Sequence, residues 1–261
     1  MLWGQRGVRF RRLALNFAQK WRRDGAWSAL RRSAEWLGER LRGHTSGDSR
    51  GQAFDHEFDI DTGGLIPLWQ LSIDSPHMAE GVRYQACDPD WIRHCIESLA
   101  INYGDFVFVD LGSGKGRALL VASEYPFRSV VGVEFSPELN AIAVDNIRKC
   151  RNLHRRCADV SSVCCDVVFW KMPARNTVFF LYNPFGECVL RRVLEALRAS
   201  LKLCERCIYI VYCNPVHAAV LDSQSFLERL DLPTVAAVYR HVPNARPKGN
   251  FGDAGRRSRR D

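Results

Sequence analysis

The 261-residue sequence has no long apolar run, and this absence limits where the protein can work. No stretch approaches the roughly 18 to 20 consecutive apolar residues that a membrane-crossing helix needs. The N-terminus also lacks the unbroken apolar core of a secretory signal, because four arginines interrupt it: Arg6, Arg9, Arg11 and Arg12. We therefore expect a cytoplasmic protein, with peripheral contact to a membrane surface as an option.

The spacing of a zinc site is also absent, although the chain has ten cysteines. Cys204 and Cys207 form a CxxC pair, but no second pair of cysteines or histidines completes a tetrahedral set. Several cysteines lie in apolar runs, such as Cys213 at the end of CIYIVYC, where cysteine behaves as a small apolar residue. These features predict reduced, structural cysteines and no metal.

The middle of the chain lacks the positive charge that the whole sequence carries. Residues 1–45 hold 11 Lys and Arg against 3 Asp and Glu, a net charge of +8, and residues 240–261 have a net charge of +5. The remainder is therefore acidic, with a net charge of −5. We divide the chain into a basic amphipathic helical extension (1–45), a single domain (46–245) and a basic tail (246–261) that we expect to be disordered.

The extension has apolar residues at helical spacing, with arginines on the other faces. The apolar positions are Phe10, Leu13, Phe17 and Trp21, then Trp27, Leu30, Leu37 and Leu41. One interpretation is a helical hairpin that packs on the main domain. Another is a helix lying in an anionic membrane surface, which this mixture of Trp, Phe and Arg favours. Nucleic-acid contact and an organelle-targeting role are further alternatives.

The stretch that follows shows no apolar periodicity. Residues 43–53 have the composition of a linker. The next polar residues lack the spacing of a known metal site, so we interpret them as a solvated acidic loop: Asp55, His56, Glu57, Asp59 and Asp61. Asp88-Pro89 then predicts a helix start, with Asp88 as the N-cap and Pro89 at the first helical position.

From residue 106 onward, short apolar runs alternate with helical patterns. The runs cover residues 106–110, 130–134, 160–165, 177–182 and 207–212, with 234–240 as a candidate last strand. Helical patterns lie near residues 115–124, 137–150 and 187–202. Apolar strands separated by helices predict an α/β fold, a doubly wound, mostly parallel sheet with helices on both faces. The ligand of such a sheet binds at the carboxyl ends of the strands.

The most specific pattern is FVDLGSGKGRALL, where a strand ends at Asp110 and three glycines precede a helix: Gly112, Gly114 and Gly116. Glycine permits backbone angles and close approaches that a Cβ forbids, and N–H groups at a helix start bind polar or negative groups. A P-loop is excluded, because it needs glycine at Val109 and Ser or Thr at Gly116. The dinucleotide GxGxxG pattern fits poorly, because Arg117 takes its third glycine position.

The run Asp-x-Gly-x-Gly-x-Gly resembles motif I of the class I, Rossmann-like S-adenosylmethionine-dependent methyltransferases, and the resemblance covers roughly residues 84–240. It implies S-adenosylmethionine as the cofactor, with Asp110 ordering the loop and facing the methionine part. Glu134, at the tip of the second strand, would accept from both ribose hydroxyls. Asp166, just after the third strand, would accept from the adenine amino group.

At the end of the fourth strand, Asn183-Pro184-Phe185 resembles the (Asp/Asn/Ser)-Pro-Pro-(Tyr/Phe) motif of amino-group methyltransferases, with one proline instead of two. In that motif two oxygens, of the Asn side chain and the first Pro carbonyl, accept from the target NH2, and the aromatic ring stacks on the target. The resemblance implies that these three residues are catalytic. A fainter similarity to seven-strand histone-lysine methyltransferases suggests Tyr84 as a lid residue over the cofactor.

Together these patterns predict a methyltransferase that uses S-adenosylmethionine and acts on an unidentified acceptor, with an amino or amide nitrogen as one candidate. Two alternatives stay open: a sensor or scaffold that binds the cofactor without turnover, and a nicotinamide-dependent oxidoreductase. Acceptor pockets vary over one fold, so a protein side chain, a nucleobase, a lipid headgroup and a small metabolite are all left open. The oligomeric state is open too.

Overall fold

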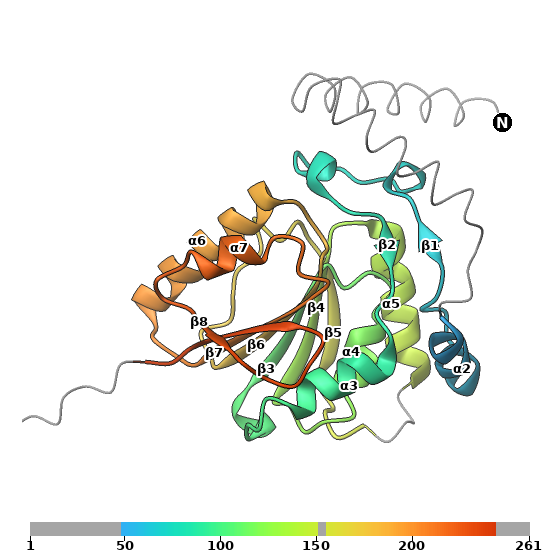
Figure 1. Ribbon diagram of the computed structural model, residues 1–261. Helices are drawn as coiled ribbons and strands as arrows, with labels where there is room; N and C mark the ends of the chain where they lie inside the picture. The colour runs from blue at the N-terminus through green and yellow to red at the C-terminus, as the bar shows by residue number, and fades with distance from the viewer. Residues whose placement is uncertain (1–47, 151–154, 244–261) are drawn as a thin grey trace, which may run out of the picture.

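The centre of the molecule is a seven-stranded sheet, in a computed structural model that describes residues 48–150 and 155–243. The strands lie in the order β5-β4-β3-β6-β7-β9-β8 (Figure 1). The five strands predicted from apolar runs are parallel: β3 (Val107–Leu111), β4 (Ser129–Glu134), β5 (Val160–Cys164), β6 (Thr177–Tyr182) and β7 (Ile208–Cys213). The predicted doubly wound, mostly parallel α/β fold is confirmed.

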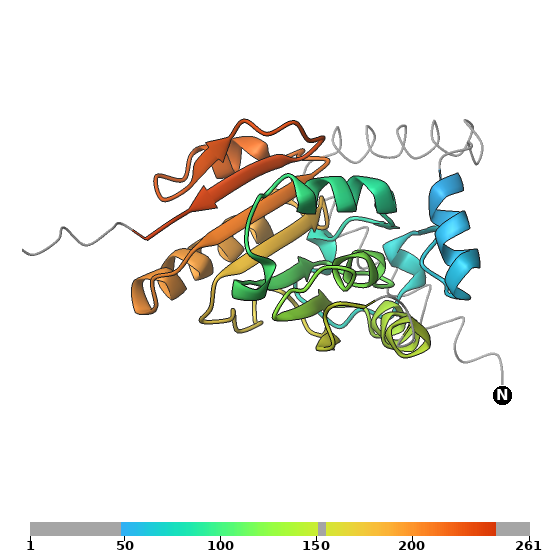
Figure 2. The ribbon, with the colours of Figure 1, turned by 90° about the horizontal axis from the view of Figure 1, so that it is seen from below.

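Two antiparallel strands extend the sheet beyond β7 (Figure 2). The candidate last strand is β9 (Ala237–His241), which pairs antiparallel with β7. The short strand β8 (Glu228–Leu230) pairs antiparallel with β9, and its three residues carry too little pattern to be predicted. The sheet thus has the seven strands that the resemblance to class I methyltransferases implied.

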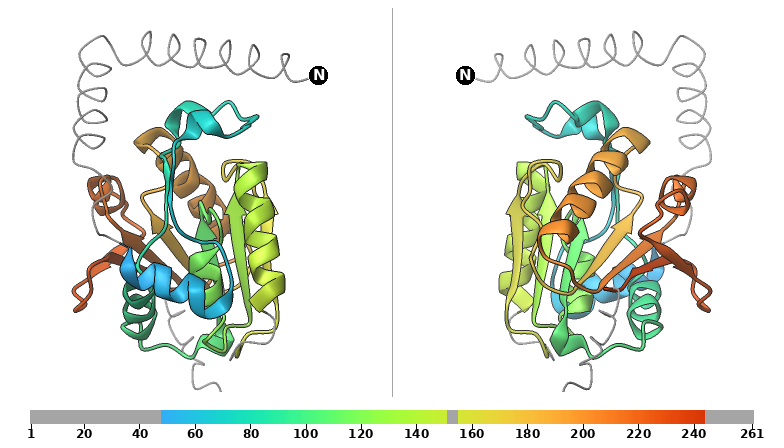
Figure 3. Two further views of the ribbon diagram at one scale, coloured as in Figure 1. Left: turned by 90° about the vertical axis from the view of Figure 1, so that its right-hand side faces the viewer. Right: turned by 90° about the vertical axis from the view of Figure 1, so that its left-hand side faces the viewer.

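Helices cover both faces of the sheet (Figure 3). One face packs against α3 (Pro89–Glu97), α4 (Arg117–Ala122) and α5 (Pro137–Lys149), and the other against α6 (Glu187–Leu203) and α7 (Ala218–Asp222). Successive strand residues alternate between the two cores, so that Phe108 faces the first and Val109 the second. Asp88 caps α3 as predicted, because its Oδ1 accepts from the Asp90 N–H at 2.8 Å.

Residues 48–87, the N-terminal arm, run beside α5 and across the edge of the sheet where the parallel strands end (Figure 1). The arm contains α2 (Ser49–Phe58) and the antiparallel pair of β1 (Leu65–Ile66) and β2 (Tyr84–Gln85). Two 3₁₀ turns, Leu68–Gln70 and Met78–Glu80, lie between β1 and β2, and a third, Tyr103–Asp105, precedes β3. The interpretation of residues 43–53 as a linker is wrong for 49–53, which form the start of α2.

The helices predicted for residues 1–45 and the tail predicted for 246–261 lie outside the described residues. Among the helices of residues 48–150 and 155–243, none combines the length and the apolar character needed to cross a bilayer.

Candidate active site

The glycine loop between β3 and α4 has the backbone shape that only glycine adopts readily. The φ angles of Gly112, Gly114 and Gly116 are +86°, +54° and +87°. A Cβ on Gly112 would lie 2.3 Å from the Pro184 Cβ, and one on Gly114 would lie 2.1 Å from Cε2 of Tyr84. The loop therefore lies directly against two other predicted site residues, one in the arm and one after β6.

Glu134, at the end of β4, is a buried carboxylate that holds the loop in place. Its Oε2 accepts from the Gly114 N–H at 2.8 Å, and its Oε1 accepts from the Ser136 N–H at 2.9 Å. Burial raises the pKa of Glu134 to about 7, against the effect of its backbone hydrogen bonds. Each carboxylate oxygen has two lone pairs, so both oxygens can accept a further hydrogen bond from a ligand hydroxyl.

Asp110, at the end of β3, is a second buried acid. Burial, together with the nearby charge of Glu134, raises its pKa to about 8. With these raised pKa values the two acids are partly protonated near neutral pH, and a positively charged group bound beside them would favour their ionised forms.

Asp166 is the third predicted acid, and the arm already contacts it. Its Oδ2 accepts from the Ser75 hydroxyl at 2.5 Å and from His77 Nδ1 at 2.7 Å, and its Oδ1 accepts from the Val168 N–H at 2.9 Å. Partial burial acts to raise the pKa of Asp166, but these hydrogen bonds outweigh it and lower the pKa. The NH1 group of Arg192 donates to His77 Nε2 at 2.6 Å, so the proton of the neutral ring is on Nδ1.

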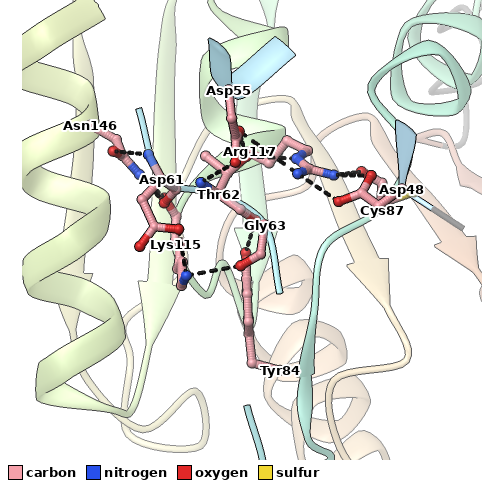
Figure 4. A network of polar contacts seen from close by, with 10 residues as sticks. All are labelled: Asp48, Asp55, Asp61, Thr62, Gly63, Tyr84, Cys87, Lys115, Arg117 and Asn146. Carbon is pink, nitrogen blue, oxygen red and sulfur yellow. Dashed lines mark hydrogen bonds and ion pairs between the residues drawn. The ribbon is translucent and has the colours of Figure 1, made fainter. Parts of the chain in front are cut away.

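The two cations of the loop bind the arm (Figure 4). Lys115 Nζ donates to Asp61 Oδ1 at 2.6 Å and to the Gly63 carbonyl at 2.8 Å. Arg117, with 2% of its side chain exposed, forms a two-pronged ion pair with Asp48 at 2.9 and 3.0 Å. Its Nε donates to Thr62 Oγ1 at 2.6 Å, and its NH1 donates to the Cys87 carbonyl at 3.2 Å.

Two further residues complete this network, which fixes three separate parts of the arm to the start of α4. The Asn146 amide, on α5, donates to the carbonyls of Asp61 and Lys115 at 2.8 and 3.0 Å. The Tyr84 hydroxyl donates to the Thr62 carbonyl at 2.6 Å, which places its ring against Gly114. Burial raises the Tyr84 pKa far above its usual value, so the hydroxyl keeps its proton.

The turn after β6 contains the residues predicted to be catalytic, and its oxygens already accept hydrogen bonds. Asn183 has a φ of +46°, and its Oδ1 accepts from the Tyr212 hydroxyl at 3.0 Å. The Pro184 carbonyl accepts from the Val82 N–H at 3.0 Å. Phe185 is buried and forms an antiparallel bridge with Gly81, so the arm pairs with this turn.

These elements enclose a pocket of about 710 Å³, a volume that includes space open to solvent. Six of the predicted site residues line it: Tyr84, Gly112, Glu134, Asp166, Pro184 and Phe185. Four others do not line it: Asp110 lies in β3, and Gly114, Gly116 and Asn183 lie in the loops that follow β3 and β6. Apolar side chains form much of the wall, including Leu68, Phe135, Leu139, Val167 and Val189.

The main residues that the sequence reasoning missed are Lys115, Arg117, Ser75 and His77. A signal for the first two was present, because buried cations need partners and an acidic segment lies upstream of them. The interpretation of that segment as a solvated loop is wrong: Asp55, His56 and Glu57 belong to α2, and Asp61 pairs with Lys115. Asp55 Oδ2 accepts from the Thr62 N–H at 2.8 Å, and its Oδ1 lies 3.7 Å from Arg117. In the described part of the chain, no group of three or more His, Cys, Asp or Glu side chains is arranged to hold a metal ion.

No family model and no curated protein matches the chain by sequence. Solved structures are similar to it at low identity. An RNA methyltransferase from Salinibacter ruber, in complex with S-adenosyl-L-homocysteine, is 19% identical, with 63% of this chain and 97% of that chain covered and a TM-score of 0.40. A dimethyladenosine transferase from Plasmodium falciparum is 11% identical, with 60% and 62% covered and a TM-score of 0.44.

A third similar structure, geranyl diphosphate C-methyltransferase from Streptomyces coelicolor, is 17% identical, with 48% of this chain and 44% of that chain covered and a TM-score of 0.38.

Proposed function

We propose that this protein is an S-adenosylmethionine-dependent methyltransferase, and the pocket at the carboxyl edge of the sheet carries the proposal. Glu134 and Asp166 line that pocket, and Asp110 ends the strand between β4 and β6. The cofactor supplies a methyl group on a positively charged sulfonium, and transfer breaks the S–C bond and leaves its electron pair on a neutral thioether. Buried acids beside the pocket favour a positively charged ligand of this kind.

The residues present fit such a cofactor. The backbone of Gly112 lines the pocket, and no Cβ fills the space between β3 and Pro184. Glu134 has lone pairs for the ribose hydroxyls, and the apolar side chains of Phe135, Leu139 and Val167 suit the faces of an adenine ring. Asp166 is the candidate acceptor for the adenine amino group, through an oxygen that it shares with Val168 or with the arm.

The alternative of a nicotinamide dinucleotide is disfavoured by the ion-pair partners of the two cations beside the glycine loop. A dinucleotide brings a pyrophosphate to the helix start, where cations and free N–H groups stabilise it. Here Lys115 and Arg117 both bind acids of the arm instead. Only a measurement of methyl transfer distinguishes an enzyme from a sensor that binds S-adenosylmethionine without turnover.

The reaction end of the pocket is assigned to the turn after β6. Asn183, Pro184 and Phe185 remain the candidate catalytic residues, with Asn183 orienting the acceptor and Phe185 lining its slot. Asn183→Ala is expected to leave cofactor affinity nearly unchanged and to abolish turnover, whereas equal losses in both would remove this role. A target NH2 group would have to share oxygens that already accept from Tyr212 and Val82.

The first test is the heat of binding of S-adenosylmethionine and S-adenosylhomocysteine. We expect micromolar binding that weakens at least about tenfold in Glu134→Ala, since hydrogen bonds to a buried carboxylate are lost. Glu228→Ala is the matched control, because Glu228 is an exposed acid on β8 that pairs with Arg240. Thermal unfolding of each variant checks that the fold is kept.

Two outcomes decide between the alternatives. No binding of either ligand, with binding of NADH instead, would replace the methyltransferase proposal by the oxidoreductase. Binding of S-adenosylmethionine with no transfer to any acceptor class, from nucleic acids and proteins to small metabolites, would favour the sensor.

Residues 1–45 are proposed to recruit the protein to anionic membranes, on the strength of their net charge of +8 and their apolar periodicity. The expected result is sedimentation with vesicles that contain phosphatidylserine, weakened by salt and lost when residues 1–45 are deleted. Equal sedimentation of the deletion variant would contradict this role.

A further inference from the structure

The arm carries the acidic excess of the domain. Residues 48–87 hold 7 Asp and Glu against 2 Lys and Arg, a net charge of −5. The two cations of the loop, Lys115 and Arg117, offset part of this charge from below. Three further acids of the arm are exposed to solvent: Glu57, Asp59 and Asp74.

Exposed apolar side chains lie on or beside the same segment. Leu65, Trp69 and Val82 belong to the arm, and Trp69 is 50% exposed. Phe169, which follows β5, is 68% exposed, and its ring centroid lies 5.7 Å from that of His77 in the arm. Single exposed apolar residues are common, whereas a group of them is typical of an interaction site. We call these four residues and the three exposed acids the arm surface.

The arm surface borders the mouth of the pocket. Val82 and Gln85 are exposed and also line the pocket, so they lie where it meets the protein surface. Leu65 is paired with Gln85 between β1 and β2, which places both side chains on one face of this strand pair. Trp69 follows Leu68, another residue that lines the pocket. A segment bound to the arm surface would therefore cover the mouth.

The basic extension joins the domain at this edge of the sheet. Asp48, where the described chain begins, is fixed to Arg117 at the start of α4 by an ion pair of 2.9 Å. In the left view of Figure 3, α2 and the strand pair of the arm lie in front of the strands of the large sheet. Two residues, 46 and 47, separate the extension from Asp48. A tether this short holds a segment near its site at an effective concentration that is roughly millimolar.

The extension also has the chemistry that complements the arm surface. Residues 1–45 have a net charge of +8, with apolar residues at helical spacing and arginines on the other faces. Opposite charges attract the two segments, and contact removes apolar side chains of both from water. An anionic membrane, or the arm of a second copy, would be repelled by the acids of the arm surface, so neither is the favoured occupant.

Building on the proposed function, we infer that residues 1–45 dock on the arm surface of their own chain and cover the mouth of the pocket. The arginines and apolar residues that would dock there are also those proposed to bind an anionic membrane, so the two contacts compete. The pocket would then be covered away from membranes and uncovered at an anionic lipid surface, because each contact weakens the other by the same factor.

Cross-linking tests the contact without any cofactor. The photoreactive residue p-benzoylphenylalanine takes the place of Trp69 in the full chain, and mass spectrometry identifies the linked peptides. We expect links to residues 1–45 within one chain. The control places it at Leu203, which is 91% exposed at the far end of α6, by the start of β7. No link from position 69 to residues 1–45, equal linking from position 203, or links between two chains would overturn docking.

The affinity for S-adenosylhomocysteine tests whether docking covers the pocket. Deletion of residues 1–45 should raise it about tenfold, because the covered fraction of the full chain cannot bind. The double variant Trp69→Ser, Asp74→Lys of the full chain should approach the deletion, and neither residue lines the pocket. The double variant Leu203→Ser, Glu205→Lys, at exposed positions, should match the unsubstituted chain. Equal affinities of the full chain and the deletion would overturn the covering role.

Vesicles test the competition. Phosphatidylserine vesicles should raise the affinity of the full chain for S-adenosylhomocysteine toward that of the deletion, and phosphatidylcholine vesicles should not. The deletion should respond to neither. An affinity of the full chain that phosphatidylserine leaves unchanged would overturn the competition. If neither chain binds S-adenosylhomocysteine, the proposed function fails instead, and cross-linking still decides whether the extension docks.

Discussion

The two ends of the pocket are held by different forces. At the cofactor end, Lys115 and Arg117 are buried cations that pair with acids of the arm, and buried Glu134 accepts from the loop itself. At the acceptor end, the turn after β6 is held by neutral hydrogen bonds from Val82 and Tyr212. A buried charge that loses its partner is penalised far more than a neutral group, so the cofactor end tolerates little change.

Because of this difference, the cofactor end is constrained in sequence, whereas side chains at the acceptor end can change. Asp48 and Asp55 of the arm pair with Arg117, Asp61 pairs with Lys115, and both cations are buried. The acceptor end keeps its backbone shape through Asn183 and the Pro184 carbonyl, while apolar pocket-lining side chains such as Leu68 and Val189 can vary without breaking an ion pair. Substrate choice can therefore change on a constant cofactor site.

The largest expected effect comes from the central cation of the cofactor end. Arg117→Met should lower the free energy of unfolding by about 4 kcal/mol, because it strands Asp48 and Thr62 and breaks a largely buried ion pair. Arg240→Met is the control, since it removes an exposed pair with Glu228 and should change stability by at most about 1 kcal/mol. Urea unfolding measures both, and equal losses would contradict the comparison.

The second prediction concerns pH. The raised pKa values, about 7 for Glu134 and about 8 for Asp110, mean that the folded protein holds these protons more tightly than the unfolded chain. Their contribution to stability is full below the usual carboxyl pKa and is lost as the pH rises through 7 to 8. For Glu134 the loss is on the order of 3 kcal/mol, from about 1.4 kcal/mol for each unit of pKa.

Denaturant unfolding between about pH 4 and pH 8 measures this effect, and stability should fall less steeply in Glu134→Gln. Glu228→Gln, at an exposed position, should keep the slope of the unsubstituted protein. An unchanged slope in Glu134→Gln would show that the carboxylate at the cofactor end is not the group that titrates.

A smaller difference in unfolding free energy distinguishes the cost of backbone strain at a glycine from the cost of a clash with the arm. Gly114→Ala and Gly64→Ala both place alanine at a positive φ, +54° and +92°, but a Cβ at Gly64 has nothing within 4 Å. Each should lose about 1 to 2 kcal/mol from the backbone, and Gly114→Ala should lose about 2 kcal/mol more from its clash with Tyr84. Equal unfolding free energies of the two variants would mean that Tyr84 moves away from the added Cβ without an energetic cost.

The smallest effect is expected at the acceptor end. Tyr212→Phe removes the hydrogen bond to Asn183 and should lower the free energy of unfolding by about 1 kcal/mol, with no change in affinity for S-adenosylhomocysteine. Tyr239→Phe, which removes a hydroxyl on β9 that donates to Asp222 at the end of α7, is the matched control. A loss of cofactor affinity in Tyr212→Phe alone would show that the two ends of the pocket are coupled.

Features that depend on neighbours in the chain could be predicted from the sequence. The helix predicted at 137–150 is α5 (Pro137–Lys149), because Ser136 caps it and apolar residues recur along one face. The three glycines have the positive φ angles that their spacing suggested. The placement of α4 and α5 on one face and α6 on the other follows the right-handed rule for crossovers, given the direction in which the strands are added on each side of β3.

Features that depend on distant partners could not be predicted. The start of α2, residues 49–53, looked like part of a linker because the helix has a weak apolar pattern and contains Gly51. That glycine is needed by a distant partner, since a Cβ on it would lie 2.2 Å from the Arg117 guanidinium. Asp166 was predicted to bind adenine, and its contacts with Ser75 and His77 could not be predicted because those residues are 91 and 89 positions away in the sequence. Likewise, only the fold shows that the oxygens of the turn after β6 are already engaged.

The arm is synthesised before the elements that it packs against. Ser75 precedes Asp166 by 91 residues, and a ribosome adds about 5 to 20 residues per second, so Ser75 waits roughly 5 to 20 s for its partner to be synthesised. During that interval β6 and the turn after it do not yet exist, and the arm has only part of its docking surface. Residues 48–87 therefore stay accessible to chaperones and proteases until that surface is complete, although in the finished protein they enclose the pocket.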